Sequence, residues 1–321
     1  MGTSIYEDIE PADFSEIDSY SLNDRKSKVD LEAFASVVGA GNSVSEFLDS
    51  LPDILGAKSL KSLAQKIVEA RKAGKPIIWG IGGHVIKTGL APILINLLER
   101  GYVSAIACNG SVLVHDSEIA TVGFTSEDVD ATLGSGSFGA ARETGELLGE
   151  AASIAAAKDI GLGEAFCANL IEKEPAFASS SLLCAAYRNA VPVTSHVTIG
   201  ADIGHFHPTV RGNDLGQGSH VDFRLFTSLV AKMNDGGVYL NCGSAVTLPE
   251  VFLKAVTINR NLGSMVSGIT TANLDFIQHY RPLTNVIKRP NAGGAGKGFA
   301  ITGHHEIMVP LLAAAIDSYS Q

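Results

Sequence analysis

Short apolar runs alternate with amphipathic stretches through most of the chain. A buried strand is expected from residue 77, where the run IIWGIGG is broken by glycines, and others at 103–111 and 238–246. Between these runs, apolar residues recur at helical spacing, as at 59–73 and 90–100, and this recurrence is typical of helices with one buried face. Runs rich in β-branched residues that alternate with helices indicate a parallel sheet with both faces covered. The pattern therefore predicts an α/β protein of Rossmann-like type, a parallel sheet with helices on both faces.

The remaining elements have a weaker pattern. Three glycines, Gly134, Gly136 and Gly139, form a GxGxxG that is expected to open a helix running to about residue 157. Residues 291–298 are expected to form a glycine-rich loop. Further helices are expected at 43–50, 165–173, 180–189, 219–233, from Pro249 to about 258 and from about 305 to 319, and further strands at 268–271 and, as an irregular edge, at 277–287.

The first 35 residues differ from the rest. They alternate acidic and aromatic positions and show no helical or strand period. We expect an N-terminal arm at residues 1–35, of the kind that packs on a neighbouring subunit. Residues 36–321 are expected to form a single α/β domain of nucleotide-binding type.

The stretch at residues 191–210 concentrates chemically active side chains. A β-rich run breaks at Gly200, and four groups that bind ligands or move protons fall within twelve residues: His196, Asp202, His205 and His207. Parallel strands open onto a crevice at their carboxyl ends, where ligands bind. We therefore expect the sheet to be organised around this strand, and its end to form the floor of the active site.

Glycines also mark the ends of three other expected strands, at Gly82-Gly83, Asn109-Gly110-Ser111 and residues 241–244. Together with residues 200–204 they would line one cleft with backbone, which suits an elongated cofactor. The GxGxxG at residues 134–139 has two interpretations, a phosphate contact at a helix N-terminus or a tight turn that begins the helix. The poor strand before it favours the turn.

Composition and charge narrow the class of protein. A net charge of −10 and a pI near 5.3 argue against a surface for nucleic acid, which would need clustered Lys and Arg. Four widely separated cysteines are expected to be buried, reduced thiols. The N-terminus lacks the apolar segment of a secretory signal, and no apolar run approaches the roughly 18 residues of a membrane span. We expect a cytoplasmic protein with no membrane partner.

Histidines leave a metal site open as an alternative. His205-x-His207 with His196 or Asp202 could hold zinc or iron, or the pair could serve substrate binding and acid/base work. His304-His305-Glu306 could complete such a site or cap the last helix, and the cap is favoured because Glu306 suits a positive helix end. Asp275 and His279 are expected on one helical turn, as a substrate-binding cluster or an ordinary surface pair.

The order of these turns resembles the deoxyhypusine synthase family. Residues 82–89, which include Thr88, lie where that family has a small-residue turn that touches NAD, and Asn109-Gly110-Ser111 lies at its second glycine turn. The run IGADIGHFHP is similar to a glycine-and-aspartate turn before a Phe-His pair, here Phe206-His207. Residues 241–244, with Gly243 and Ser244, take the position of a triple-glycine turn. The resemblance implies a parallel-sheet fold with NAD bound in a cleft at a subunit interface.

One departure limits what the resemblance implies about activity. The family forms an imine on a lysine just after the triple-glycine turn, and residues 245–250 contain no lysine. The chain is therefore not expected to be a true deoxyhypusine synthase.

We expect instead an NAD-dependent transferase or oxidoreductase that acts on a small amine or amino-acid-derived substrate, in a homodimer or homotetramer. His205 or His207 would be the general base, since the usual pKa of histidine suits neutral pH. Asp202 would orient a histidine or the cofactor ribose, and Glu250 would hold a substrate ammonium. The alternatives are a metal-dependent hydrolase that uses His196, His205 and His207, and a non-catalytic ligand-binding homologue.

Overall fold

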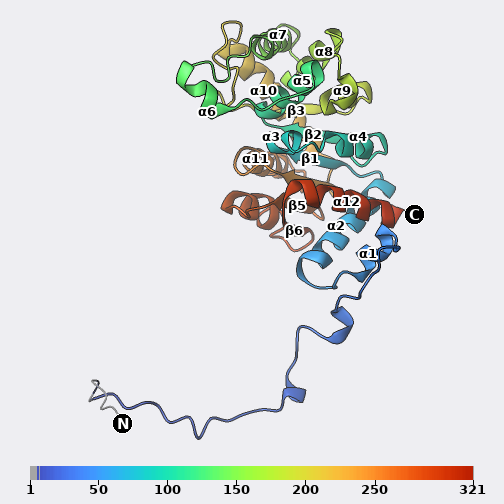
Figure 1. Cartoon of the computed structure of the whole chain (residues 1–321), viewed down its shortest axis with the longest axis vertical. Coiled ribbons are helices and arrows are strands. Elements are labelled where there is room, and N and C mark those ends of the chain that lie inside the picture. Colours follow the sequence, from blue (N-terminus) through green and yellow to red (C-terminus); the bar gives the residue numbers. More distant parts are fainter. Residues whose placement is uncertain (1–5, 7, 321) are drawn as a thin grey trace.

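A six-stranded sheet forms the centre of the protein. The computed structural model describes residue 6 and residues 8–320. The strands are β1 (Ile77–Ile81), β2 (Ala105–Cys108), β3 (Val193–Ser195), β4 (Val238–Cys242), β5 (Thr270–Asp275) and β6 (Lys297–Thr302). All neighbouring strands are parallel, in the order β3-β2-β1-β4-β5-β6 (Figure 1). The predicted Rossmann-like α/β fold is confirmed.

Helices cover both faces of this sheet. On one face α10 packs on α11, and α11 on a π-helix at Pro282–Lys288; on the other α2 packs on α12, and α4 on α9 and α12 (Figure 1). The helices are α1 (Val44–Ser50), α2 (Leu55–Lys72), α3 (Gly83–Lys87), α4 (Ala91–Glu99), α5 (Gly110–Val122), α6 (Val129–Thr132), α7 (Arg142–Lys158), α8 (Leu162–Glu172), α9 (Leu182–Arg188), α10 (Gly212–Ala231), α11 (Thr247–Asn261) and α12 (His305–Ser320).

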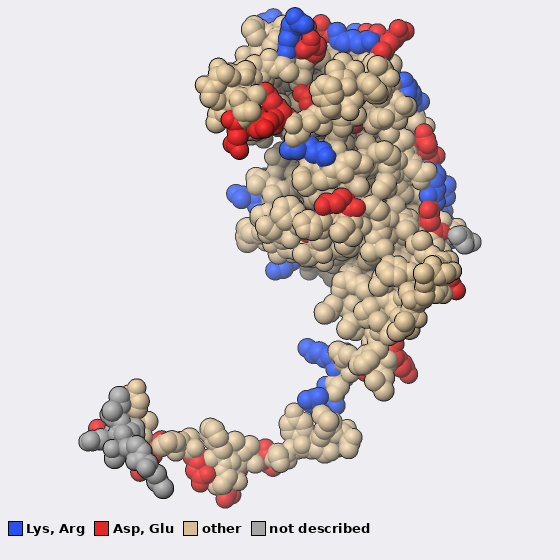
Figure 2. Space-filling model, viewed as in Figure 1, with Lys and Arg blue, Asp and Glu red and all other residues tan. Residues whose placement is uncertain are grey.

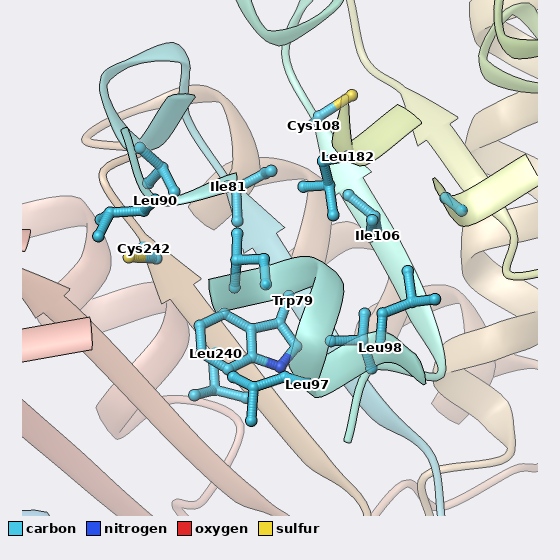
Figure 3. Packing of buried hydrophobic residues seen from close by; sticks show 14 of the residues in the cluster. Trp79, Ile81, Leu90, Leu97, Leu98, Ile106, Cys108, Leu182, Leu240 and Cys242 are labelled. Atoms are coloured by element: carbon cyan, nitrogen blue, oxygen red, sulfur yellow. The ribbon is translucent and has the colours of Figure 1, made fainter. Parts of the chain in front are cut away.

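The central strand β1 explains why both faces are covered. All five of its residues are buried, and their side chains alternate between the faces. Trp79 and Ile81 join the core beneath α4 and α12 (Figure 3). Ile78 joins a second core with Phe226 of α10. Trp79 Nε1 donates to the carbonyl oxygen of Tyr102 at 3.1 Å, so the indole N–H is not left unpartnered in the core. All four cysteines are free and buried.

Three expectations about the sheet are wrong. The strand expected to organise the sheet pairs only over Val193–Ser195 and lies at an edge; the centre is β1, which pairs with both β2 and β4. Residues 277–287 do not form an edge strand, because the chain enters the π-helix there. The edge strand is β6, which begins inside the expected glycine-rich loop at residues 291–298 and continues past its end. Only Phe299 and Ile301 of β6 are buried hydrophobic residues, so its apolar run is too short to predict a strand.

Helix α5 is a further element that the pattern did not predict. It carries buried residues around most of its surface, including the polar Asp116 and Ser117. A helix buried on nearly all sides has no polar face to produce a 3.6-residue period. The helix expected from the GxGxxG begins later, at Arg142.

The N-terminal segment extends away from the sheet and its helices (Figure 1). Its described residues are mostly exposed and include two short 3₁₀ turns, Leu22–Asp24 and Leu31–Ala33. The arm at residues 1–35 and its packing on another subunit stay predictions, and residues 1–5 and 7 lie outside the described residues. None of the helices in the described part of the chain combines the length and apolar character that a bilayer crossing requires.

Candidate functional site

The carboxyl ends of β1, β2, β4 and β5 lie at one edge of the sheet, because all strands are parallel. The chain runs outward from β1 to β2 and β3, then returns to β4 on the other side of β1. Helix α4, which follows β1, and α11, which follows β4, therefore cover opposite faces. Such a change of direction opens a crevice between the two strand ends, where nucleotides bind in open α/β sheets.

Four of the predicted cofactor-binding residues meet in this crevice. A Cβ atom on Gly82 would overlap the carbonyl oxygen of Gly243 and lie 2.8 Å from its carbon, and one on Gly83 would lie 3.0 Å from Ser111 Cβ. Gly243 adopts a φ of +72°, which favours glycine. The chain's own packing therefore requires these glycines, and the turns after β1, β2 and β4 lie against one another.

Hydroxyl groups near this crevice already have partners. Ser244 Oγ accepts from Leu248 N at 3.2 Å, in the first turn of α11. Thr88 Oγ1 donates to the carbonyl oxygens of His84 and Val85, at the end of α3. Ser111 Oγ donates to Asn109 Oδ1 at 2.9 Å. These contacts hold the turns in place.

Asp202 and His205 are brought to the same edge by the loop after β3. A Cβ atom on Gly110 would lie 2.8 Å from Asp202 Cγ, so this carboxylate lies at the N-terminus of α5. Burial raises the pKa of Asp202, and His205 and the N–H groups of Thr198 and Ser111 oppose the rise. Asp202 Oδ2 and His205 Nε2 are both buried and have no hydrogen-bond partner in the described part of the chain. The two atoms form an acceptor and a donor that a ligand can satisfy.

Backbone contacts fix the tautomers of His205 and His207. Gly200 N donates to His205 Nδ1 at 3.0 Å, and Thr209 N donates to His207 Nδ1 at 3.3 Å. An Nδ1 that accepts carries no proton, so in the neutral ring the proton is on Nε2. Both rings therefore present a donor rather than a base in this arrangement. His207 also packs against α7, where a Cβ atom on Gly145 would lie 2.6 Å from His207 Cβ.

The three histidines of the metal alternative do not converge. His196 is 4 % exposed, shares a hydrogen bond with Thr194 and lies edge-on to Phe226. Burial lowers its pKa to about 4. Among residue 6 and residues 8–320, no three His, Cys, Asp or Glu side chains are grouped in a way that could hold a metal ion. The structure therefore does not support a hydrolase site built from His196, His205 and His207.

Glu250 is not free to hold a substrate ammonium. Its carboxylate forms ion pairs with Lys254 and Arg281, and Asn285 Nδ2 donates to it at 2.7 Å. The hydrogen bond from Lys254 is the main reason that the pKa of Glu250 lies below its usual value. Glu250 instead joins α11 to the π-helix.

A second polar group lies at the ends of β4 and β5, where it brings together residues that the sequence had suggested only for separate sites. His305 is 1 % exposed and contacts Gly243, while Asp275 is the last residue of β5. His84, after β1, lies edge-on to His305 with 5.6 Å between ring centroids, and Phe276 lies near both rings. The proposed helical pair of Asp275 and His279 is wrong, because Asp275 lies in a strand. A histidine directly after a strand was a usable signal, but β6 itself was not recognised.

Helix α5, α7 and the loop between them enclose a separate cavity of about 330 Å³. Its walls are partly apolar, with Phe124 and Leu147, and Glu118 accepts hydrogen bonds there from Thr125 and Thr144. Acidic side chains gather on the segment around α6 (Figure 2). Gly139 N donates to the carboxylate of Glu127 in this segment. The GxGxxG turn at residues 134–139 therefore binds a carboxylate of the chain itself. The acidic surface favours a positively charged ligand.

Asp222 of α10 gives a prediction about stability. This fully buried carboxylate accepts from Gly163 N and Ser195 N, both at 2.8 Å, and burial raises its pKa to about 7. Between about pH 4 and 7 the folded state then binds more protons than the unfolded state, so the free energy of unfolding falls as the pH rises, by on the order of 3–4 kcal/mol from this group. Urea unfolding of Asp222→Asn across that range should lack this fall. An unchanged pH profile in the variant would contradict the assignment.

Comparisons with known proteins agree with this fold. The model of a family described as "Arginine dihydrolase ArgZ-like, C-terminal, Rossmann fold" matches residues 61–157. No curated protein matches.

Solved structures are similar at low identity. A putative LOR/SDH protein from Methanococcus maripaludis S2 has a TM-score of 0.52 and 17% identity over 83% of this chain and 70% of its own. AgrE in a ternary complex with ornithine and NAD+ has a TM-score of 0.51 and 15% identity, over 82% of this chain and 34% of its own. A putative deoxyhypusine synthase from Entamoeba histolytica has a TM-score of 0.49 and 12% identity, over 86% of this chain and 93% of its own.

These similarities concern the fold. The chain spans about a third of the length of AgrE and of ArgZ, a cyanobacterial arginine dihydrolase. At identities below one fifth, the neighbours do not single out the deoxyhypusine synthase family. The protein is an α/β protein with a Rossmann-like sheet, and part of it matches the Rossmann-fold model of the ArgZ-like family.

Proposed function

We propose that the chain is an NAD-dependent oxidoreductase that acts on a small, positively charged amino-acid-like substrate. The observation that carries the proposal is the meeting of the turns after β1, β2 and β4 in one crevice, beside two unpartnered buried atoms, Asp202 Oδ2 and His205 Nε2. The similarity of the fold to that of AgrE, which was solved with ornithine and NAD+, supports the choice of cofactor and substrate class.

The residues present fit a dinucleotide. The N-termini of α5 and α11 point to this edge because each helix follows a strand of the parallel sheet, and helix N-termini favour anions such as a pyrophosphate. Asp202 Oδ2 would accept a hydrogen bond from a ribose hydroxyl, and His205 Nε2 would donate one to the cofactor or to a substrate carboxylate. When bound, NAD supplies an acceptor for a hydride from the substrate carbon.

NAD is expected to raise the melting temperature in a thermal-shift titration, because a ligand that binds only the folded state stabilises it by about 2.7 kcal/mol at 100 times its Kd. The companion assay offers L-ornithine with NAD and follows absorbance of reduced nicotinamide and loss of ornithine. L-Norvaline, which lacks the terminal amine, is the control substrate. A protein that bound NAD but turned over no cationic amino acid would instead be a non-catalytic binding homologue.

Asp202→Asn is expected to weaken NAD binding by about tenfold or more, since a hydrogen bond to a charged group contributes about 1.5–3 kcal/mol. Isothermal titration calorimetry measures the change. Asp128→Asn, at the exposed cap of α6, is the matched control and should bind NAD as the wild type does. Equal affinity of Asp202→Asn and the wild type would remove Asp202 from the cofactor site.

A further inference from the structure

His305 occupies a buried position that no helix cap requires. It is the first residue of α12, and β6 ends at Thr302. The turn between them is held by Gly303 N, which donates to the carbonyl oxygen of Asp275 at 3.1 Å. The ring reaches back across the sheet edge: a Cβ atom on Gly243 would lie 3.1 Å from His305 Cε1. His305 therefore lies at the β4 side of the crevice between β1 and β4.

His305 has the same tautomer as His205 and His207, with the proton on Nε2, but a different ring nitrogen is left without a partner. His305 Nε2 lies 3.0 Å from the carbonyl oxygen of Leu274. A carbonyl oxygen only accepts, so the proton is on Nε2 and Nδ1 carries a lone pair. Of these three rings, His305 alone presents a base at this edge.

That lone pair is buried and has no hydrogen-bond partner in the described structure. A buried acceptor without a partner costs about 1–3 kcal/mol, and such groups in native proteins call for a functional or structural explanation. The ring lies close to Gly243 and Leu274 at the sheet edge and to the rings of His84 and Phe276. His304 stacks on Phe276.

His84 lies beside this buried ring. It is exposed in part and lies edge-on to His305. Burial first, and then the neighbouring His305, lower the pKa of His84.

We propose that His305 Nδ1 is the general base of the reaction, and that His84 passes the proton from His305 to solvent. The proposal rests on the proposed function. His305 Nδ1 would take a proton from the substrate nitrogen, and the carbon bonded to that nitrogen would lose a hydride, for which a bound NAD would supply the acceptor, so that the C–N single bond would become a double bond. His305 then carries protons on both nitrogens and returns to the neutral form by losing the Nδ1 proton through His84.

The first readout does not depend on turnover. Histidine labelled with ¹⁵N gives separate NMR signals for Nδ1 and Nε2, and His305→Gln identifies those of His305 by their loss. We expect a protonated Nε2 and an unprotonated Nδ1 in the free protein, and a change at Nδ1 when NAD and L-ornithine are both added. A proton on Nδ1 in the free protein, or an Nδ1 signal that stays unchanged with both compounds bound, would overturn the proposal.

The second readout is kinetic. His305→Gln keeps an amide that can donate to Leu274 and removes the base, so NAD affinity should stay within twofold while ornithine oxidation falls by about 100-fold or more. His304→Gln, next to it and exposed, should oxidise ornithine within twofold of the wild type. His84→Phe keeps a ring beside His305 and should lose about tenfold, with partial rescue by imidazole in the buffer, which a purely structural loss would not show.

The outcomes separate the two proposals. If NAD does not bind the wild type, the oxidoreductase function and the base both fail. If NAD binds and His305→Gln oxidises ornithine at the wild-type rate, only the base fails. If NAD binds but ornithine is not oxidised, the NMR signal of His305 Nδ1 tests the base. An unchanged signal with both compounds bound overturns the assignment of the base, and a changed signal supports it.

Discussion

Replacing Gly82 with alanine is expected to destabilise the protein by about 3 kcal/mol or more and to abolish NAD binding. The new methyl group would overlap the carbonyl oxygen of Gly243. Neither backbone can withdraw easily, because Gly82 N donates to the carbonyl oxygen of Cys242 at 2.9 Å and Gly243 N to that of Leu274 at 3.3 Å. Relief of the clash would separate the ends of β1 and β4, and so distort the crevice.

Urea unfolding followed by the fluorescence of Trp79, the one tryptophan of the chain, measures this change from within β1. Gly134→Ala is the matched control, since a Cβ atom there would meet nothing within 4 Å, and we expect a change within about 0.5 kcal/mol. The pair of variants also compares two glycine motifs. Loss of NAD binding in Gly134→Ala but not in Gly82→Ala would move the cofactor site to the loop before α7.

Asp116→Ala is expected to lower the free energy of unfolding by about 3–5 kcal/mol, because it leaves several buried donors without an acceptor. Asp116 is fully buried on α5 and accepts from Ser181 Oγ and from the N–H groups of Leu182, at 2.9 Å, and Leu183, at 3.1 Å. The carboxylate, which belongs to α5, thus accepts hydrogen bonds from the first N–H groups of α9. Burial raises its pKa to about 6, so the group is largely charged at neutral pH.

Chemical denaturation near neutral pH measures this loss. Asp128→Ala removes an exposed cap from the four-residue helix α6, and we expect it to cost about 1 kcal/mol or less. If Asp116→Ala cost no more than Asp128→Ala, the contacts of Asp116 with α9 would not contribute to stability.

The candidate site changes meaning once the hydrogen-bonded nitrogen of each histidine ring is considered. Sequence spacing predicted His205 or His207 as the base, and both side chains do lie on the loop after β3. Their Nδ1 atoms, however, accept backbone N–H groups, whereas His305 donates to a backbone carbonyl. The direction of one hydrogen bond on each ring decides whether that ring has a lone pair free to accept a proton. For His305 this direction is set by Leu274, which is remote from it in sequence.

The sequence by itself determined the class of fold and the edge where the site lies. The run at β1 is apolar at nearly every position and the helices around it are amphipathic, so a covered parallel sheet was the arrangement that buried both. Glycines after β1, β2 and β4 marked the turns at one edge. These features are local, since each depends on a few adjacent residues.

Only the tertiary structure decided which strand is central, which glycines touch and which nitrogen of each histidine ring lacks a partner. Strand order depends on pairing between distant segments, so the run before His196 could not be placed at the edge, and β6 could not be distinguished from a loop. The ion pairs of Glu250 with Lys254 and Arg281 depend in the same way on the approach of α11 to the segment after β5. The role of a side chain depends on its neighbours in space. Spacing along the chain predicts those neighbours only when they lie in the same helix or strand.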